Sequence, residues 1–143
     1  MSTKLKIAMA QISPVWLDKD ATLIKIKNAI IEAAAIGCEL IVFGEALVPG
    51  YPFWLALTGG AEWNTNRNKK LHAHYVRNSV CIENGDLDDI CQLAKTHKMA
   101  IYLGIIERPL DRGGHSIYAS LVYIDETGQI KSVHRKLQPT YDE

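Results

Sequence analysis

The stretch ELIVFGEALVPGYPFW, residues 39–54, decides how the rest of the chain is interpreted. Its residues 40–43 are all apolar, which is typical of a short strand buried on both faces of a sheet. The Pro-Gly-Tyr-Pro sequence at 49–52 ends regular structure and turns the chain sharply. Glu45 therefore stands where a buried strand ends, and layered α/β folds build their sites at such strand ends.

The sequence around Glu45 differs from that around a typical solvent-exposed acidic residue in a loop. A carboxylate that follows a strand is most often exposed to solvent. Glu45, however, lies between an apolar strand and a loop rich in proline, glycine and aromatic residues. Such surroundings predict a partly desolvated carboxyl group, whose pKa is raised toward that of a general base. Glu45 is therefore a candidate base on its local sequence alone.

Regular elements are predicted on both sides of this stretch. Residues 6–12 are predicted to form a short, mostly apolar strand that is buried, and a helix capped by Asp18 or Asp20 is predicted to continue to about residue 36, before Gly37. Together with the strand at 40–43 they make a β-α-β unit with parallel strands. The remaining predicted elements are helices over 68–80 and 86–95 and strands over 99–106, 116–124 and 129–137, the last two strands pairing antiparallel.

Composition restricts the class of protein. The chain has 143 residues, 48% hydrophobic and 22% charged, which suits one globular domain with a core. Its sixteen basic and sixteen acidic residues cancel, so neither nucleic acid nor a membrane surface is expected as a partner. No apolar run approaches the ~20 residues of a membrane span, and the N-terminus lacks a signal-peptide pattern. We therefore expect a cytoplasmic protein whose partners are small molecules or other subunits.

The cysteines and histidines do not indicate a metal site. Cys38, Cys81 and Cys91 show neither Cys-x-x-Cys nor Cys/His spacing, so each is interpreted as a small buried hydrophobe. The loop-like surroundings of Cys81 leave it as the candidate for a reactive thiol. His72 and His74 are two residues apart, whereas a pair of metal ligands on a helix needs three or four. We interpret them as surface or packing histidines.

The second informative stretch is HRKLQPT, residues 134–140, at the end of the last predicted strand. By itself, a basic triplet there is most often a solvated strand edge. Together with KIAMAQ at 6–11 and FGEALVPGYPFW at 43–54, it resembles the nitrilase family of carbon–nitrogen hydrolases, over essentially the whole chain. The resemblance implies an α/β fold, a nitrilase-like α-β-β-α sandwich. Residues 1–143 would then be the N-terminal part of a single carbon–nitrogen hydrolase domain, about the first half of the sandwich.

The resemblance also implies which residues carry out the chemistry. The family uses a Glu-Lys-Cys triad, in which Glu45 matches the general base and Lys136 matches the lysine. Glu143 matches a second glutamate that lies near the lysine in relatives. Tyr51 and Trp54 are candidates to line the substrate pocket, although a place in the core is the commoner role for each. No cofactor and no metal is required.

The expected reaction is hydrolysis of a nitrile to a carboxylic acid and ammonia through a covalent thioimidate and acyl-enzyme. Hydrolysis of an amide is the alternative. The family's nucleophilic cysteine follows the lysine motif, and no cysteine of this chain does so. We therefore expect the 143 residues to be inactive alone, either as part of a longer nitrilase or as a non-catalytic chain that associates with full-length relatives. The complete protein is expected to be a homo-oligomer.

Overall fold

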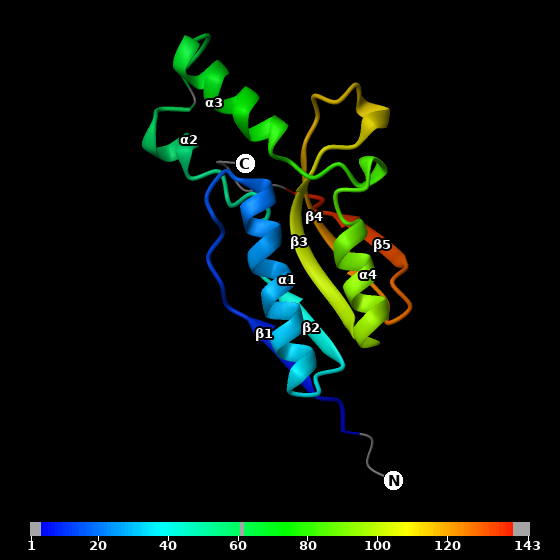
Figure 1. Ribbon diagram of the computed structural model, residues 1–143. Coiled ribbons are helices and arrows are strands. Elements are labelled where there is room, and N and C mark those ends of the chain that lie inside the picture. The colour runs from blue at the N-terminus through cyan, green and yellow to red at the C-terminus, as the bar shows by residue number, and fades with distance from the viewer. Residues whose placement is uncertain (1–3, 61, 139–143) are drawn as a thin grey trace.

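The computed structural model describes residues 4–60 and 62–138, which form one mixed sheet with two helices packed on one face (Figure 1). The first three strands are parallel, and each later strand is antiparallel to the one before it. The strands follow chain order across the sheet: β1 (Ile7–Ala10), β2 (Leu40–Phe43), β3 (Ala100–Glu107), β4 (Tyr118–Ile124) and β5 (Ile130–Arg135).

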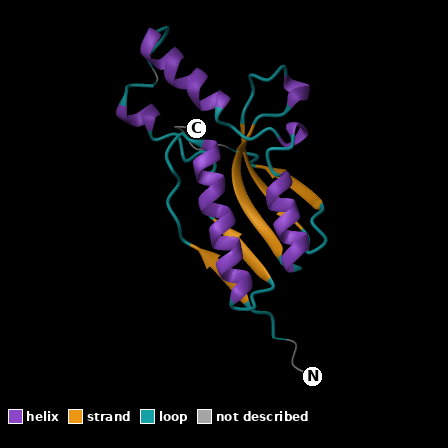
Figure 2. Cartoon of the chain, in the orientation of Figure 1, coloured by secondary structure: helices purple, strands orange, loops and turns teal. Residues whose placement is uncertain are grey.

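The helices occupy the connections between the strands (Figure 2). They are α1 (Lys19–Ala35), α2 (Trp54–Leu57), α3 (Asn66–Arg77) and α4 (Asp88–His97), with the short 3-10 turns η1 (Ile82–Asn84) and η2 (Leu110–Arg112). The helix α1 begins at a predicted cap, where the Asp18 carboxylate accepts a hydrogen bond from the backbone N–H of Ala21. Gly37 follows the helix with φ 76°, the left-handed conformation that glycine adopts without strain.

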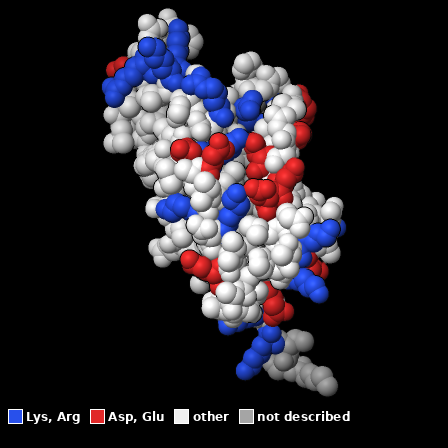
Figure 3. All heavy atoms as spheres, viewed as in Figure 1, with Lys and Arg blue, Asp and Glu red and all other residues white. Residues whose placement is uncertain are grey.

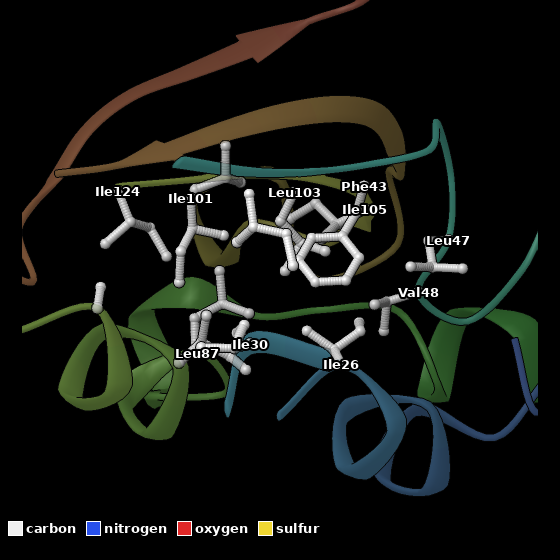
Figure 4. Close-up of a cluster of buried hydrophobic side chains, with 14 of the residues drawn as sticks. Ile26, Ile30, Phe43, Leu47, Val48, Leu87, Ile101, Leu103, Ile105 and Ile124 are labelled. Atoms are coloured by element: carbon white, nitrogen blue, oxygen red, sulfur yellow. The ribbon is translucent and has the colours of Figure 1, made fainter. Parts of the chain in front are cut away.

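The core lies between the sheet and the helices α1 and α4, which lie side by side in Figure 1. Side chains at alternate positions of β3 point to this face, as the two-residue period of a strand requires. Both layers contribute fully buried aliphatic side chains, among them Ile26, Ile30, Leu87, Ile101, Leu103 and Ile105 (Figure 4). Each such side chain contributes roughly 1.5–3 kcal/mol by leaving water.

The opposite face of the sheet carries no helix within residues 4–60 and 62–138. The prediction of a buried first strand is wrong on this face, where Ile7 and Met9 are 50% and 81% exposed. They pair in register with Leu40 and Val42, which are themselves only half-buried. An apolar run predicts a strand, but it does not say whether a second layer covers both of its faces.

The helix α3 lies at the end of the sheet where β3 ends (Figure 1). It begins two residues before the predicted start, because the Thr65 hydroxyl caps it by accepting a hydrogen bond from the N–H of Asn68. Tyr75 anchors the helix: it is 2% exposed, and its hydroxyl donates to the carbonyl of Gly50 at 3.0 Å. Lys and Arg side chains gather over this helix at the top of Figure 3.

Candidate active site

The C-terminal ends of strands β2 and β5 lie at the same end of the sheet. The strand β5 is antiparallel to β4, which is antiparallel to β3, so β5 runs in the direction of β2. Glu45 follows the first of these strands and Lys136 follows the second. The Lys136 Nζ donates a hydrogen bond to Glu45 Oε1 at 3.0 Å. The fold therefore brings together two residues that are 91 positions apart.

The Glu45–Lys136 ion pair is open to solvent. The two side chains are 60% and 30% exposed, respectively. The predicted partial desolvation of Glu45 is therefore wrong for this chain, because the Glu45 side chain faces solvent although the residues that follow it, 46–50, are buried. An ion pair this exposed contributes only about 0–1 kcal/mol to stability, so the pair is not explained as a stabilising element.

Gly104 in β3 allows the backbone at Glu45 to lie directly against the sheet. A Cβ at position 104 would lie 2.2 Å from the carbonyl oxygen of Gly44 and 2.8 Å from the Cα of Glu45. Only a residue without a side chain fits this approach. The sequence pattern did not single out Gly104, because the contact exists only once the backbone after β2 lies against β3.

Lys136 is held at its backbone and through the residue before it. Its N–H donates to the carbonyl of Ala119 at 2.8 Å. The Arg135 guanidinium donates two hydrogen bonds to Glu107, from Nε at 2.9 Å and from Nη2 at 2.8 Å, and the Ser120 hydroxyl donates a third at 2.7 Å. Burial acts to raise the pKa of Glu107, but these bonds and the positive charge of Arg135 outweigh it and hold that pKa below its ordinary value.

The sequence analysis did not identify the cluster of Glu107, Ser120 and Arg135. Each residue stands in a different strand, so no local spacing connects them. The signal that could have found them is a charged or polar residue at a position where strand alternation predicts a buried side chain, with an opposite charge at the matching position of the last strand.

A cavity of about 610 Å³ opens beside Lys136. Trp54 and Tyr75 contribute rings that pack edge to face, with centroids 6.2 Å apart. His72 of α3, interpreted from sequence as a surface or packing residue, is exposed and also lines this cavity. The other apolar lining residues include Leu55, Ile106, Ile117, Ala119 and Leu137. An apolar cavity with an ammonium group suits a small molecule that has an apolar substituent and a polar reacting group.

The structure brings some of the predicted site residues together and not others. Trp54 lines the cavity beside Lys136, and Glu45 bonds to Lys136. Tyr51 lines a separate depression with Pro52 and Phe53. Glu143 lies outside the described residues.

Among residues 4–60 and 62–138, no group of histidine, cysteine and acidic side chains could hold a metal ion. In the same part of the chain, none of the helices is both long and apolar enough to cross a membrane.

None of the three cysteines lines the cavities beside Lys136. Cys38 and Cys81 are buried, as predicted, whereas Cys91 is half-buried in α4. Burial raises the pKa of the Cys81 thiol and of the Cys91 thiol, which disfavours the reactive thiolate. The loop-like sequence around Cys81 thus encloses a buried thiol.

Comparison with known proteins places the chain in a family. The family model of the carbon–nitrogen hydrolases matches residues 6–143. The chain belongs to the carbon–nitrogen hydrolase family. It is 38% identical over 142 residues to an arylacetonitrilase of Aspergillus niger and 36% identical over 142 residues to an aliphatic nitrilase of Rhodococcus rhodochrous. These matches cover 99% and 96% of this chain but 39% and 36% of the relatives, so the chain spans about two fifths of their length.

Solved structures share the fold. An amidase from Nesterenkonia sp. matches with a TM-score of 0.62 and 17% identity, over 94% of this chain and 43% of the amidase. The NitFhit protein of C. elegans matches with a TM-score of 0.61 and 19% identity, over 93% of this chain and 28% of that protein. The α/β nitrilase-like fold and the carbon–nitrogen hydrolase family, both predicted from sequence motifs, are confirmed.

Proposed function

We propose that this chain supplies the general base and the lysine of a nitrile-hydrolysing site, where Glu45 and Lys136 act with a cysteine thiolate. The observation that carries the proposal is the 3.0 Å contact between Lys136 Nζ and Glu45 Oε1, beside a largely apolar cavity. The names of the relatives, an arylacetonitrilase and an aliphatic nitrilase, support a nitrile as the substrate class.

The chemistry explains why a carboxylate and an ammonium group belong together. The carbon of a nitrile is a weak electrophile, so a thiolate is a suitable nucleophile. Glu45 takes the thiol proton, and the sulfur then bonds to the nitrile carbon while a carbon–nitrogen π pair moves to nitrogen. That nitrogen takes up a proton, which gives a thioimidate. The Lys136 ammonium group stabilises the negative charge that develops on nitrogen.

Hydrolysis of the thioimidate completes the reaction. Glu45 takes one proton from water as the water oxygen bonds to the thioimidate carbon, and passes that proton to nitrogen. The second proton of the water also moves to nitrogen as the carbonyl forms, and ammonia leaves. The resulting thioester is cleaved by another water in the same way, which releases the carboxylic acid and returns the proton to sulfur. Lys136 stabilises the charge on the carbonyl oxygen in this second stage.

The nucleophile in this proposal is a cysteine outside these 143 residues, so the chain alone is inactive. The burial of Cys81 and its raised pKa support this assignment. So does the amidase from Nesterenkonia sp. AN1, in which acrylamide adds to an active-site cysteine. Glu143 would be the second glutamate near the lysine. Trp54, the first residue of α2, would contact the substituent of the substrate, and Tyr51, in the loop before that helix, would contact a longer one.

Amide hydrolysis is the second candidate function. The same two residues serve it, because an amide develops its negative charge on oxygen and its ammonia leaves without a thioimidate stage. The fold likeness to the Nesterenkonia amidase, a cysteine-to-alanine mutant of which has been solved in complex with butyramide, favours this candidate. A substrate panel that contains nitriles and their matching amides distinguishes the two.

Ammonia release tests the proposal. We compare the complete product of the gene that encodes these residues with the 143-residue chain, on arylacetonitriles, aliphatic nitriles and the corresponding amides. We expect turnover by the complete product only, and its loss in Glu45→Gln and Lys136→Ala. Lys131→Ala is the matched control, since Lys131 is a 55% exposed, ion-paired lysine of β5, the strand that ends just before Lys136. Turnover by Lys136→Ala would contradict the role of that lysine. Turnover by the 143-residue chain would contradict the nucleophile, and Cys81→Ala would then be tested.

A further inference from the structure

Glu107 is the most deeply buried charged residue among those described, with 5% of its surface exposed. Taking a carboxylate out of water is costly unless it is paired and hydrogen-bonded. Its two oxygens accept both bonds from Arg135 and the bond from Ser120. The Arg135 guanidinium also lies over the ring of Tyr118, 4.4 Å from its centroid. The hydrogen bonds and the positive charge of Arg135 therefore offset the cost of burying the Glu107 carboxylate at the end of β3.

This cluster connects three neighbouring strands. Glu107 belongs to β3, Ser120 to β4 and Arg135 to β5, and Ser120 pairs in register with Arg135. The next residue after Arg135 is Lys136. Because consecutive side chains of a strand point to opposite faces, Arg135 is held on the helix-covered face while Lys136 reaches Glu45 on the other. One peptide unit thus joins the buried ion pair to the candidate catalytic pair.

The end of β5 has few other attachments in the described part of the chain. The strand lies at the edge of the sheet and pairs only with β4. Beyond it, Leu137 is 90% exposed. Among the described residues, the backbone bond from Lys136 to Ala119, the side-chain bond from Lys136 to Glu45 and the side-chain bonds of Arg135 attach this end to its neighbours.

We propose that Glu107 and Arg135 are positioning residues, whose ion pair fixes the end of β5 so that Lys136 Nζ stays within reach of Glu45. An arginine suits this task, because its planar fork meets both oxygens of one carboxylate and so sets an orientation as well as a distance. The inference rests on the proposed function for the catalytic meaning of the Glu45–Lys136 pair. The positioning itself is testable without turnover.

Site-resolved acetylation of lysines in the folded 143-residue chain, followed by mass spectrometry, tests the positioning. Both Lys136 and Lys131 are ion-paired, to Glu45 and to Asp125 respectively, but Lys136 is 30% exposed and Lys131 is 55% exposed, so we expect Lys136 to react more slowly. In Glu107→Gln and in Arg135→Gln, the rate at Lys136 should rise to that of Lys131. The rate at Lys131 itself should not change, whereas general loosening of the fold would raise both.

Two control variants separate positioning from a purely structural role. Ser120→Ala removes one hydrogen bond from the same carboxylate but leaves both bonds from Arg135, so the rate at Lys136 should stay at the wild-type value. Asp86→Asn breaks another partly buried ion pair, at 2.7 Å, and should raise the rate at Lys19 alone.

An unchanged rate at Lys136 in Glu107→Gln and Arg135→Gln overturns the proposal, as does an equal rise in Ser120→Ala. Circular dichroism shows whether each variant folds, and either folded variant is sufficient for the test. If both unfold while Ser120→Ala does not, the ion pair is a folding element and the proposal is also overturned. Failure of the complete gene product to hydrolyse nitriles or amides would refute the proposed function and leave the labelling result unaffected.

Discussion

Replacement of Gly104 by alanine is expected to push Glu45 away from the sheet. The new Cβ would lie 2.2 Å from the Gly44 carbonyl oxygen, whereas ordinary contacts begin at 3.4 Å, so the two atoms must separate by about 1.2 Å. The obstructing atoms belong to the backbone, so no change of rotamer relieves the overlap. Forcing an added methyl group into a packed position costs roughly 1–3 kcal/mol. Most of the movement should fall on the loop that carries Glu45, because β3 is held by strands on both sides.

Urea unfolding followed by circular dichroism measures the cost, with Gly44→Ala as the matched control. A Cβ at position 44 meets nothing within 4 Å, so this variant should equal the wild type or gain up to ~1 kcal/mol from the restricted unfolded chain. Gly104→Ala should lose about 2 kcal/mol. In the complete gene product it should also lower turnover by about 100-fold, the effect expected of a ~1 Å misplacement. Equal stability of the two variants would refute the close approach of Gly104 to Glu45.

Three further predictions concern the hydrophobic core, unfolding at low pH and the buried thiol of Cys81. Ile30→Ala should lower the free energy of unfolding by roughly 2–5 kcal/mol, because Ile30 is fully buried, whereas Ile31→Ala, at a 46% exposed position, should cost less than about 1 kcal/mol in the same urea titration. Hydrogen bonds from the Thr127 hydroxyl and the Gln129 N–H hold the pKa of Asp125 at about 2, below its ordinary 3.8. The stability that Asp125 contributes is therefore present above about pH 4 and lost as the pH falls toward 2, and Asp125→Asn should flatten that part of the acid unfolding curve; an unchanged slope would contradict this. Burial raises the pKa of Cys81, so iodoacetamide should modify it far more slowly in the native chain than in urea, as mass spectrometry would show; equal rates would argue against a buried thiol.

Local sequence was sufficient for most of the helices and strands. The apolar run at 40–43 coincides with β2, and the predicted cap Asp18 and terminator Gly37 bound α1. These features succeed because strand alternation, helix caps and left-handed glycines depend on residues a few positions apart. The helix predicted over 68–80 was displaced by two to three residues, because its cap at Thr65 lay in a polar stretch without apolar periodicity.

Predictions of burial were weaker than predictions of element type. Met9 was expected inside and is 81% exposed, and Glu45 was expected to be partly desolvated and is 60% exposed. Both errors have one cause: an apolar or aromatic neighbourhood in sequence does not reveal which face of a sheet is covered. Gly104 and the Glu107–Arg135 pair were missed for a related reason, since each has meaning only beside a residue from a distant segment.

The sequence by itself determined the order and type of most of the elements. Through its motifs it also indicated the family, and Glu45 and Lys136 as the residues to examine. Only the tertiary structure decided that these two side chains meet at 3.0 Å and that Gly104 makes room for one of them. It also decided that Arg135, the residue before Lys136, bonds to the buried Glu107. The physical reason is that contact across 91 residues depends on strand order, direction and register, which are set by how the whole sheet packs and not by any local period.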